Sequence, residues 1–190
     1  SEDPLLSGES AAALINGVQS QNVGTSLKHF AANNQEQSRM VIDTIVDERT
    51  LREIYLAAFE IAVKKSQPWT VMCSYNRLDG IYCSEHNRLL NEILRDEWGF
   101  EGFVVTDWGA QNNRVEGLSA GLDLEMPGSG RINDQRIVDA VTQGQLPEET
   151  VERAAKRIVQ VILAAQGVRE SDHQVDHDAH HALAQRAAEE

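Results

Sequence analysis

The sequence predicts an α/β fold, a partial (β/α)8 barrel of the TIM type, on two observations. Segments that favour strands alternate with segments that favour helices, as in a parallel sheet with helical crossovers. A complete eight-stranded barrel needs about 250 residues, whereas this chain has 190. Apolar segments are predicted as strands at 25–30, 69–75, 102–106 and 122–126. Four strands in place of eight indicate part of a barrel.

Helices are predicted where apolar residues recur every three or four positions. The first covers 9–20. Asp47 is a candidate N-cap of the second, whose apolar positions span 51–62, and Ser84 is a candidate N-cap of the third, which Gly99 ends. The remaining helices are predicted at 118–121, 132–141, 147–162 and 179–190. The second, third and fourth of these helices separate one predicted strand from the next, as the fold requires.

The chain is predicted to divide into three parts. Residues 1–168 form the central and C-terminal part of the barrel. After Gly167 the sequence becomes polar, and four of its six histidines lie between 171 and 181, so we interpret 169–178 as a solvated linker. Residues 179–190 are rich in alanine and are predicted to be the first helix of a second domain, truncated in this chain.

The composition argues against several classes of function. The chain has 17 Lys and Arg against 30 Asp and Glu, a net charge of −13, which makes nucleic acid a poor partner. No apolar run reaches the roughly 18 residues of a membrane span. Cys73 and Cys83 are the only cysteines and form no CxxC motif, so they indicate buried free thiols rather than a disulfide framework or a zinc site. The compartment stays open.

Polar and aromatic residues at the predicted ends of three strands are candidates for a functional site, because barrel enzymes build their active sites at the carboxyl ends of the strands. These residues are Lys28 and His29 at the first strand end, Tyr75 and Asn76 at the second, and Asp107 and Trp108 at the third. They are predicted to gather at the mouth of the barrel.

Asp107 suits a nucleophile, because a carboxylate after a buried strand and beside the indole of Trp108 can face a sugar ring. An aspartate after a strand also commonly starts a turn, so both interpretations stay open. Lys28 and His29 can donate hydrogen bonds to substrate hydroxyls, or can form an ion pair between strands. Lys28 can alternatively form a Schiff base if it is desolvated, although nothing in its local sequence favours this.

Four further residues carry a less specific signal. Arg39 is predicted in a loop, where it fits either a substrate clamp or a surface charge. Met72 fits the core better than a site. Asp123 and Glu125 alternate with leucines, which fits a second acidic pair or, preferably, a strand with one polar face.

Several blocks of the sequence resemble the β-glucosidase-like branch of glycoside hydrolase family 3. The blocks are SEDPLLSG at 1–8, KHFAANNQE at 28–36, SYN at 74–76, EWGFEGFVVTDWGA at 97–110 and GLDLEMP at 121–127. They follow the family's order over nearly the whole chain. The resemblance implies a retaining, exo-acting β-glycosidase that hydrolyses terminal β-linked sugars without a metal or an organic cofactor.

The resemblance also implies a role for each candidate residue. Asp107 matches the nucleophile that forms a covalent glycosyl-enzyme. Lys28, His29 and Arg39 match positions that hold the sugar hydroxyls, while Met72, Tyr75 and Trp108 match positions that line the terminal subsite. The implied partner is therefore a glycoside or oligosaccharide, and the composition indicates neither nucleic acid nor a membrane.

The departures from the family pattern define what we expect of these 190 residues alone. In relatives the acid/base glutamate comes from a second domain, of α/β-sandwich type, and earlier barrel strands supply an aspartate and an arginine for the same sugar. Neither is found in this chain, so we expect an inactive central fragment that partners with the remaining segments of its parent. The alternatives are a Schiff-base aldolase that uses Lys28 and a non-catalytic, sugar-binding barrel fragment. The sugar and its linkage stay open.

Overall fold

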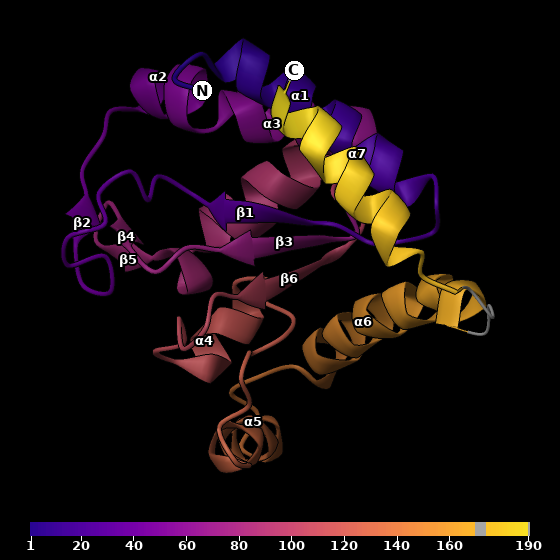
Figure 1. Cartoon of the computed structure of the whole chain (residues 1–190). Helices are drawn as coiled ribbons and strands as arrows, with labels where there is room; N and C mark the ends of the chain where they lie inside the picture. The colour runs from indigo at the N-terminus through magenta and orange to yellow at the C-terminus, as the bar shows by residue number, and fades with distance from the viewer. Residues whose placement is uncertain (170–173, 190) are drawn as a thin grey trace.

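A parallel sheet lies at the centre of the computed structural model, which describes residues 1–169 and 174–189. Within these residues it has three strands, in the order β1 (Ser26–Phe30), β3 (Thr70–Cys73) and β6 (Phe103–Thr106). Figure 1 shows the three arrows side by side and pointing the same way. The predicted strands at 25–30, 69–75 and 102–106 are therefore confirmed.

The fourth predicted strand, 122–126, is reduced to one parallel bridge between Leu124 and Val105. Leu124 donates its N–H to Val104 O and accepts the N–H of Thr106, both at 3.0 Å. The pairing then stops, because the N–H of Met126 binds the Thr106 hydroxyl instead of a backbone carbonyl, at 2.8 Å. Pro127, which has no N–H, follows directly.

A second, smaller sheet lies beyond the carboxyl ends of β1 and β3 (Figure 1). It contains β2 (Asp43–Thr44), β4 (Arg77–Leu78) and β5 (Ile81–Tyr82), with β4 parallel to β2 and antiparallel to β5. Asp79 and Gly80 connect β4 to β5 with φ of 49° and 88°, the left-handed region that a tight hairpin turn needs. The sequence does not predict these strands, because two residues are too few to show a period.

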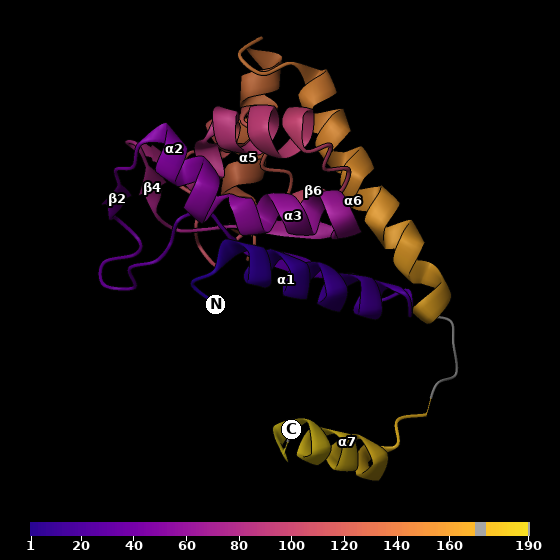
Figure 2. The same ribbon diagram turned by 90° about the horizontal axis from the view of Figure 1, so that it is seen from above.

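The helices cover one side of the main sheet and continue along its far edge. In chain order they are α1 (Pro4–Gln19), α2 (Glu48–Thr50), the π-helical η1 (Leu51–Tyr55), α3 (Ala57–Ser66), the 3₁₀ turn η2 (Cys83–Glu85), the π-helical η3 (Arg88–Glu97), α4 (Arg114–Ser119), α5 (Ile132–Thr142), α6 (Glu148–Arg169) and α7 (His177–Glu189). Figure 2 shows α1 and α3 running side by side, and the two helices are in contact.

Capping groups explain where the helices begin and end. The Asp47 carboxylate accepts the N–H of Thr50, which confirms the predicted N-cap. The predicted cap at Ser84 is wrong, because Ser84 lies inside η2 and the N–H of Leu89 is bound by Nδ1 of His86 instead. Gly99 follows η3 with φ of 72°, as the sequence predicts.

Two helices begin earlier than their apolar periodicity predicts. The carboxylate of Asp3 accepts the N–H groups of Leu5 and Leu6, so α1 begins at Pro4 and not at residue 9. The Asn113 side chain caps α4 in the same way. Polar capping groups, which periodicity does not register, therefore decide both starting points.

The core lies between the sheet and its covering helices. Phe30, Val71 and Val104 come from the three strands, and all are fully buried. Phe30 packs edge-on against Phe59 of α3 and Trp98 after η3, at ring-centre distances of 5.1 and 5.8 Å. This packing holds the strands, and therefore the segments that follow their carboxyl ends.

The end of the chain differs from the rest in burial. α6 joins α4 and α5 through a small cluster of Leu118, Ala140, Leu146 and Ala154. By contrast, α7 buries no residue, and Figure 2 shows it apart from the sheet. The Asp176 carboxylate accepts the N–H of Ala179, so α7 begins two residues before the predicted 179. Of the predicted linker, residues 170–173 lie outside the described part of the chain.

Candidate active site

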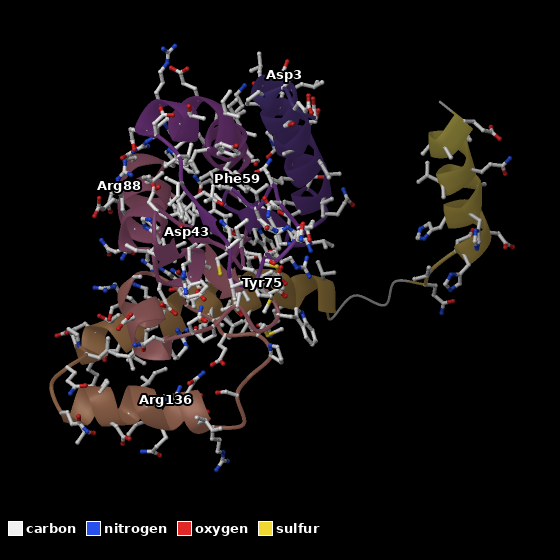
Figure 3. The ribbon with its side chains drawn as sticks, turned by 90° about the vertical axis from the view of Figure 1, so that its left-hand side faces the viewer. Asp3, Asp43, Phe59, Tyr75, Arg88 and Arg136 are labelled. Atoms are coloured by element: carbon white, nitrogen blue, oxygen red, sulfur yellow. The ribbon has the colours of Figure 1, made fainter. Side chains whose placement is uncertain are left out.

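The segments that follow β1, β3 and β6 meet at one edge of the sheet, because the strands are parallel. Figure 3 views this edge from the carboxyl ends of the strands, with Tyr75 near the centre. Oδ2 of Asp107 lies 3.4 Å from Nε2 of His29, and the Tyr75 hydroxyl donates to the carbonyl oxygen of Trp108 at 2.8 Å. Residues of three strands are thus brought into one group, as the sequence predicts.

The carboxylate of Asp107 is bound by the backbone at one oxygen and faces the His29 side chain with the other. Oδ1 accepts the N–H of Trp108 at 2.6 Å, while Oδ2 faces His29. The backbone of Asp107 also starts a turn, since its carbonyl accepts the N–H of Ala110 at 2.9 Å. The two interpretations that the spacing leaves open are therefore compatible. The side chain keeps 14 % exposure, and that of His29 keeps 36 %.

Tyr75 supports the loop that carries Asp107. Its side chain is buried against the loop, and burial together with the negative charge of Asp107 raises the pKa of Tyr75 above its ordinary value. Tyr75 therefore stays a neutral hydrogen-bond donor at any pH at which a carboxylate nucleophile works. The guanidinium of Arg39 lies over the Tyr75 ring, 4.8 Å from its centre.

Arg39 fits the interpretation of a surface charge and also lies against Tyr75. Its NH1 group forms an ion pair with Glu36 at 2.9 Å, and its side chain is 44 % exposed, as expected of a surface charge. The contact with Tyr75 nevertheless places the guanidinium beside the predicted site. A guanidinium carries further N–H donors that suit a ligand hydroxyl.

The remaining predicted residues are Lys28, Met72 and Trp108, of which Trp108 contacts Asp107 and Tyr75 through its backbone. Lys28 lies two residues before Phe30, at which β1 ends as predicted and which pairs with Cys73. It is exposed, so the desolvation that a Schiff-base lysine needs is missing here. Met72 is half-buried between two fully buried neighbours. The Trp108 indole is 65 % exposed, beside Asp107.

A buried network that the sequence did not reveal fixes the turn after β1. The carbonyl oxygen of Ala31 accepts hydrogen bonds from Ser74 Oγ at 3.0 Å, Asn76 Nδ2 at 3.2 Å and Cys83 Sγ at 3.5 Å. All four residues are buried. The signal available in the sequence was the pair of polar residues, Ser74 and Asn76, directly after an apolar strand. This network connects the turn after His29 to the turn that carries Tyr75.

Cys73 and Cys83 are free and buried, as predicted. Burial raises the pKa of both thiols, so they stay protonated. Within the described residues no group of three or more His, Cys, Asp or Glu side chains is arranged to hold a metal ion. No helix in that part of the chain is long and apolar enough to cross a membrane.

Asp123 has a structural environment, unlike Asp107. Its Oδ2 binds Arg95 at 2.6 Å and the N–H of Val104 at 2.8 Å, and its Oδ1 binds Arg157 at 3.0 Å. Its side chain is 1 % exposed. Glu125 accepts a hydrogen bond from Asn133 at 2.8 Å. Asp123 and Glu125 therefore do not form a second acidic pair. They are the polar face that the sequence favoured, and both side chains bind other residues of the fold.

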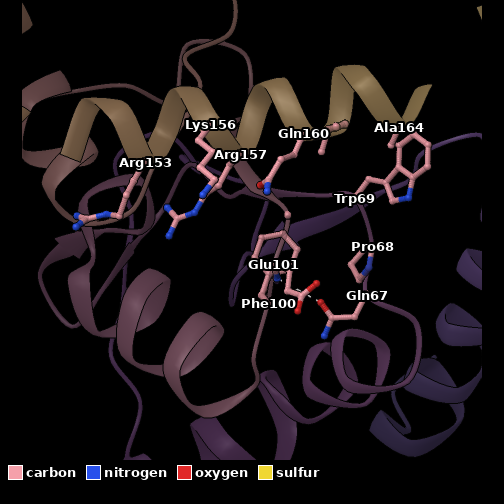
Figure 4. A pocket seen from close by; sticks show the side chains of 12 residues that line it. Gln67, Pro68, Trp69, Phe100, Glu101, Arg153, Lys156, Arg157, Gln160 and Ala164 are labelled. Atoms are coloured by element: carbon pink, nitrogen blue, oxygen red, sulfur yellow. Dashed lines mark hydrogen bonds between the residues drawn. The ribbon is translucent and has the colours of Figure 1, made fainter. Parts of the chain in front are cut away.

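The cavity in Figure 4, of about 780 Å³, lies at the opposite edge of the sheet. Trp69 and Gly102 line it, and each precedes its strand, while Tyr75 and Asp107 follow theirs. Arg153 and Arg157 of α6 form another wall. A smaller hollow of about 250 Å³ is lined by His29. The volume of a cavity therefore does not identify the candidate active site, whereas the direction of the strands does.

Comparison with known proteins identifies the family of this chain. The model of the Glycosyl hydrolase family 3 N terminal domain matches residues 1–161. The chain belongs to this family.

Two proteins of similar sequence match this chain over nearly its whole length. The thermostable beta-glucosidase B of Acetivibrio thermocellus is 62 % identical over 190 residues, which cover 100 % of this chain and 25 % of that protein. The exo-alpha-(1->6)-L-arabinopyranosidase of Bifidobacterium breve is 49 % identical over 189 residues, 99 % of this chain and 25 % of that protein. The chain thus spans about a quarter of the length of the curated relatives it matches.

Solved structures confirm the predicted barrel fold. The GH3 beta-glucosidase of Bifidobacterium adolescentis superposes with a TM-score of 0.95 at 48 % identity, over 99 % of this chain and 28 % of that one. Beta-glucosidase 3B of Thermotoga neapolitana, solved in complex with glucose, gives a TM-score of 0.92 at 50 % identity, over 98 % of this chain and 27 % of that one. The strands described above are therefore part of a TIM-type barrel.

Proposed function

We propose that this chain supplies the nucleophile and part of the terminal sugar subsite of a retaining, exo-acting β-glycosidase of the β-glucosidase type. The observation that carries the proposal is the environment of Asp107. One carboxylate oxygen is fixed by the Trp108 N–H, and the other faces the half-exposed His29 at 3.4 Å. The relatives named β-glucosidase and the glucose complex of a structural neighbour support this choice of substrate class.

The chemistry assigned to Asp107 is nucleophilic substitution at the anomeric carbon. Oδ2 forms a bond to that carbon as the bond to the leaving oxygen breaks, and an acid must protonate the leaving oxygen. Water then attacks the glycosyl-aspartate and releases the carboxylate. Oδ1 keeps its hydrogen bond to the backbone throughout, which fixes the direction of attack. The acid/base carboxyl, which retaining enzymes place about 5–5.5 Å from the nucleophile, is assigned to a segment outside these 190 residues.

The other site residues are assigned to the sugar. Lys28, His29 and Arg39 carry N–H donors that suit hydroxyl acceptors. The exposed indole of Trp108 offers a flat apolar face on which a pyranose ring can stack. Tyr75 and Met72 complete the lining. No metal or organic cofactor is part of this proposal.

We also retain the division of the chain as a proposal: barrel over 1–168, linker over 169–178 and the start of a second domain over 179–190. The family match ends at residue 161, and α7 buries none of its residues. Isolated helices of about 12–15 residues are marginally stable in water, so a helix such as α7 needs a surface to pack on. A second domain would supply that surface.

The test uses a chimera in which this chain replaces the matching segment of the Acetivibrio thermocellus enzyme, its 62 % identical relative. The chimera is treated with a 2-deoxy-2-fluoro-β-glucoside that has a good leaving group, and the trapped sugar is located by peptide mass mapping. We expect the label on Asp107. A label on Asp123, Glu125 or another carboxylate would contradict the assignment.

Turnover by the same chimera separates the alternatives. Aryl β-glucosides, β-xylosides and α-L-arabinopyranosides are compared, since one relative is named for the last activity. Sugar binding without turnover of any of them would favour a non-catalytic barrel. Borohydride trapping of a keto substrate on Lys28 would favour the aldolase. The 190-residue chain alone is expected to hydrolyse these substrates no faster than buffer, because it lacks the proposed acid.

A further inference from the structure

Thr106, the residue before Asp107, makes an unusual pair of hydrogen bonds. Its hydroxyl accepts the N–H of Met126 at 2.8 Å and donates to the carbonyl oxygen of Met126 at 3.0 Å. One side chain thus binds both backbone polar groups of one residue. Thr106 is fully buried, so these bonds are shielded from water.

The Thr106 hydroxyl replaces a backbone carbonyl as the hydrogen-bond acceptor at the end of the parallel pairing. Leu124 donates to Val104 O and accepts from Thr106 N, which is regular parallel pairing. At the next position the N–H of Met126 meets the Thr106 hydroxyl and not a backbone carbonyl. The Met126 carbonyl also accepts the N–H of Gly109 at 3.2 Å, on the far side of Asp107. Met126 therefore holds the chain both before and after the carboxylate.

The other side of the segment 106–109 is bound to the end of β3 and to Tyr75, which follows it. The N–H of Asp107 donates to Cys73 O at 3.3 Å, and the Tyr75 hydroxyl donates to Trp108 O at 2.8 Å. The segment 106–109 is thus held between two neighbouring chain segments, with Asp107 in the middle. Of these supports, the Thr106 hydroxyl is a side-chain group that substitution can remove without altering the backbone.

We infer that Thr106 is a positioning residue for the nucleophile, which acts by fixing the 106–109 segment against Met126. The inference rests on the proposed function of Asp107. Misplacing a reacting group by about 1 Å can cost on the order of 100-fold in rate, so the hydroxyl matters for the chemical step although it touches no substrate. The branched Cβ of threonine restricts the hydroxyl to few rotamers, which suits this task.

The experiment compares Thr106→Val, Thr106→Ser and the unsubstituted chimera. Valine keeps the shape and loses the hydroxyl, while serine keeps the hydroxyl. We expect Thr106→Val to lower kcat and the rate of labelling by the 2-fluoro sugar by about 10- to 100-fold, with KM changed less than about threefold. Thr106→Ser is expected to recover most of the loss.

Thr70→Val is the matched control. The Thr70 hydroxyl also donates to a backbone carbonyl, that of Thr25 at 3.1 Å, but at the amino end of β3. It is expected to leave kcat and the labelling rate unchanged. If Thr106→Val does not fold, Thr106→Ser and Thr106→Ala, which both lack the methyl group, give the same comparison of hydroxyl present and absent.

The outcomes separate this inference from the proposed function. If the unsubstituted chimera labels Asp107 but the valine variant labels as fast, or the serine variant is as slow as the valine variant, the role of Thr106 is overturned and that of Asp107 stands. A loss in all Thr106 variants that equals the loss in Thr70→Val also overturns it. A label that maps away from Asp107 overturns the proposed function itself.

Discussion

The two edges of the central sheet use aspartates in opposite ways. At the amino edge, Asp123 is 1 % exposed and is fully engaged by Arg95, Arg157 and the N–H of Val104. At the carboxyl edge, Asp107 keeps 14 % exposure, and its partners are the N–H of Trp108, the half-buried His29 and the Tyr75 side chain. A carboxylate that is surrounded by partners stabilises the fold, whereas one that stays partly exposed is available for chemistry.

The arginines show the same contrast. Burial lowers the pKa of Arg95 to about 10 in spite of its ion pair with Asp123. That guanidinium also donates to the carbonyl oxygen of Gly102 at 3.0 Å, so it serves the interior. Arg39, at the other edge, is 44 % exposed and pairs with a more exposed glutamate. Arg95 is thus paired with an aspartate in the interior, whereas Arg39 is paired with a glutamate at the surface.

The largest effect is expected from Asp107→Ala. Removing the nucleophile of a covalent mechanism should lower kcat in the chimera by about 10⁴-fold or more, while the melting temperature stays within about 2 °C, because the side chain has few partners. Steady-state kinetics with an aryl glycoside and a thermal melt check both. Residual activity within tenfold of the parent would show that this edge does not hold the nucleophile.

Asp123→Ala should lower the stability of the protein and leave its kcat unchanged. Leaving Arg95 buried without its partner costs about 3–5 kcal/mol, so we expect a large fall in melting temperature, with kcat of the folded fraction unchanged. Glu125→Gln is the matched control, since Glu125 accepts its hydrogen bond from a neutral amide, that of Asn133. If both substitutions lower stability equally, the contrast between buried and partly exposed carboxylates is wrong.

Alkaline pH should lower the stability of the folded protein through the thiols of Cys73 and Cys83. Burial raises the pKa of both thiols in the folded protein, so the unfolded chain loses their protons first. Their contribution to stability is therefore complete below about pH 8.5, the unfolded value, and falls as the pH rises, by about 1.4 kcal/mol per pH unit for each thiol.

Thermal melts of the chimera at pH 7.5 and 9.5 measure this fall. In the Cys73→Ala variant the fall should be smaller than in the parent, because one titrating group is gone, although its melting temperature at pH 7.5 is lower. An identical pH dependence in the two proteins would rule out the thiol as its cause.

The smallest effect is expected from Tyr75→Phe. The change removes the hydrogen bond to Trp108 O but keeps the ring beneath Arg39, so kcat should fall about tenfold with little change in melting temperature. Tyr82→Phe, which removes a hydroxyl bonded to Arg77 at 3.0 Å in the small sheet, is the control. An equal loss in both variants would point to a general effect of lost hydroxyls.

Much of the fold was predictable because its signals are local. The apolar run before Asp107, the cap at Asp47 and the glycine at 99 each identify an element from a few neighbouring residues. The candidate site was also partly predictable, since polar residues after parallel strands share one edge. Its geometry was not: the pattern of residues 25–30 does not show that Nε2 of His29 comes within 3.4 Å of the Asp107 carboxylate.

By itself, the sequence determined the alternation of strands and helices and the family blocks, because periodicity and motifs are properties of adjacent residues. The tertiary structure alone decided which aspartate is partly exposed and which is enclosed. Asp123 finds Arg95 and Arg157 at 28 and 34 residues' separation, and Thr106 finds Met126 at a separation of 20. Such partners meet only when the sheet forms, since hydrogen bonds and ion pairs act over a few ångströms in space and carry no pattern along the chain.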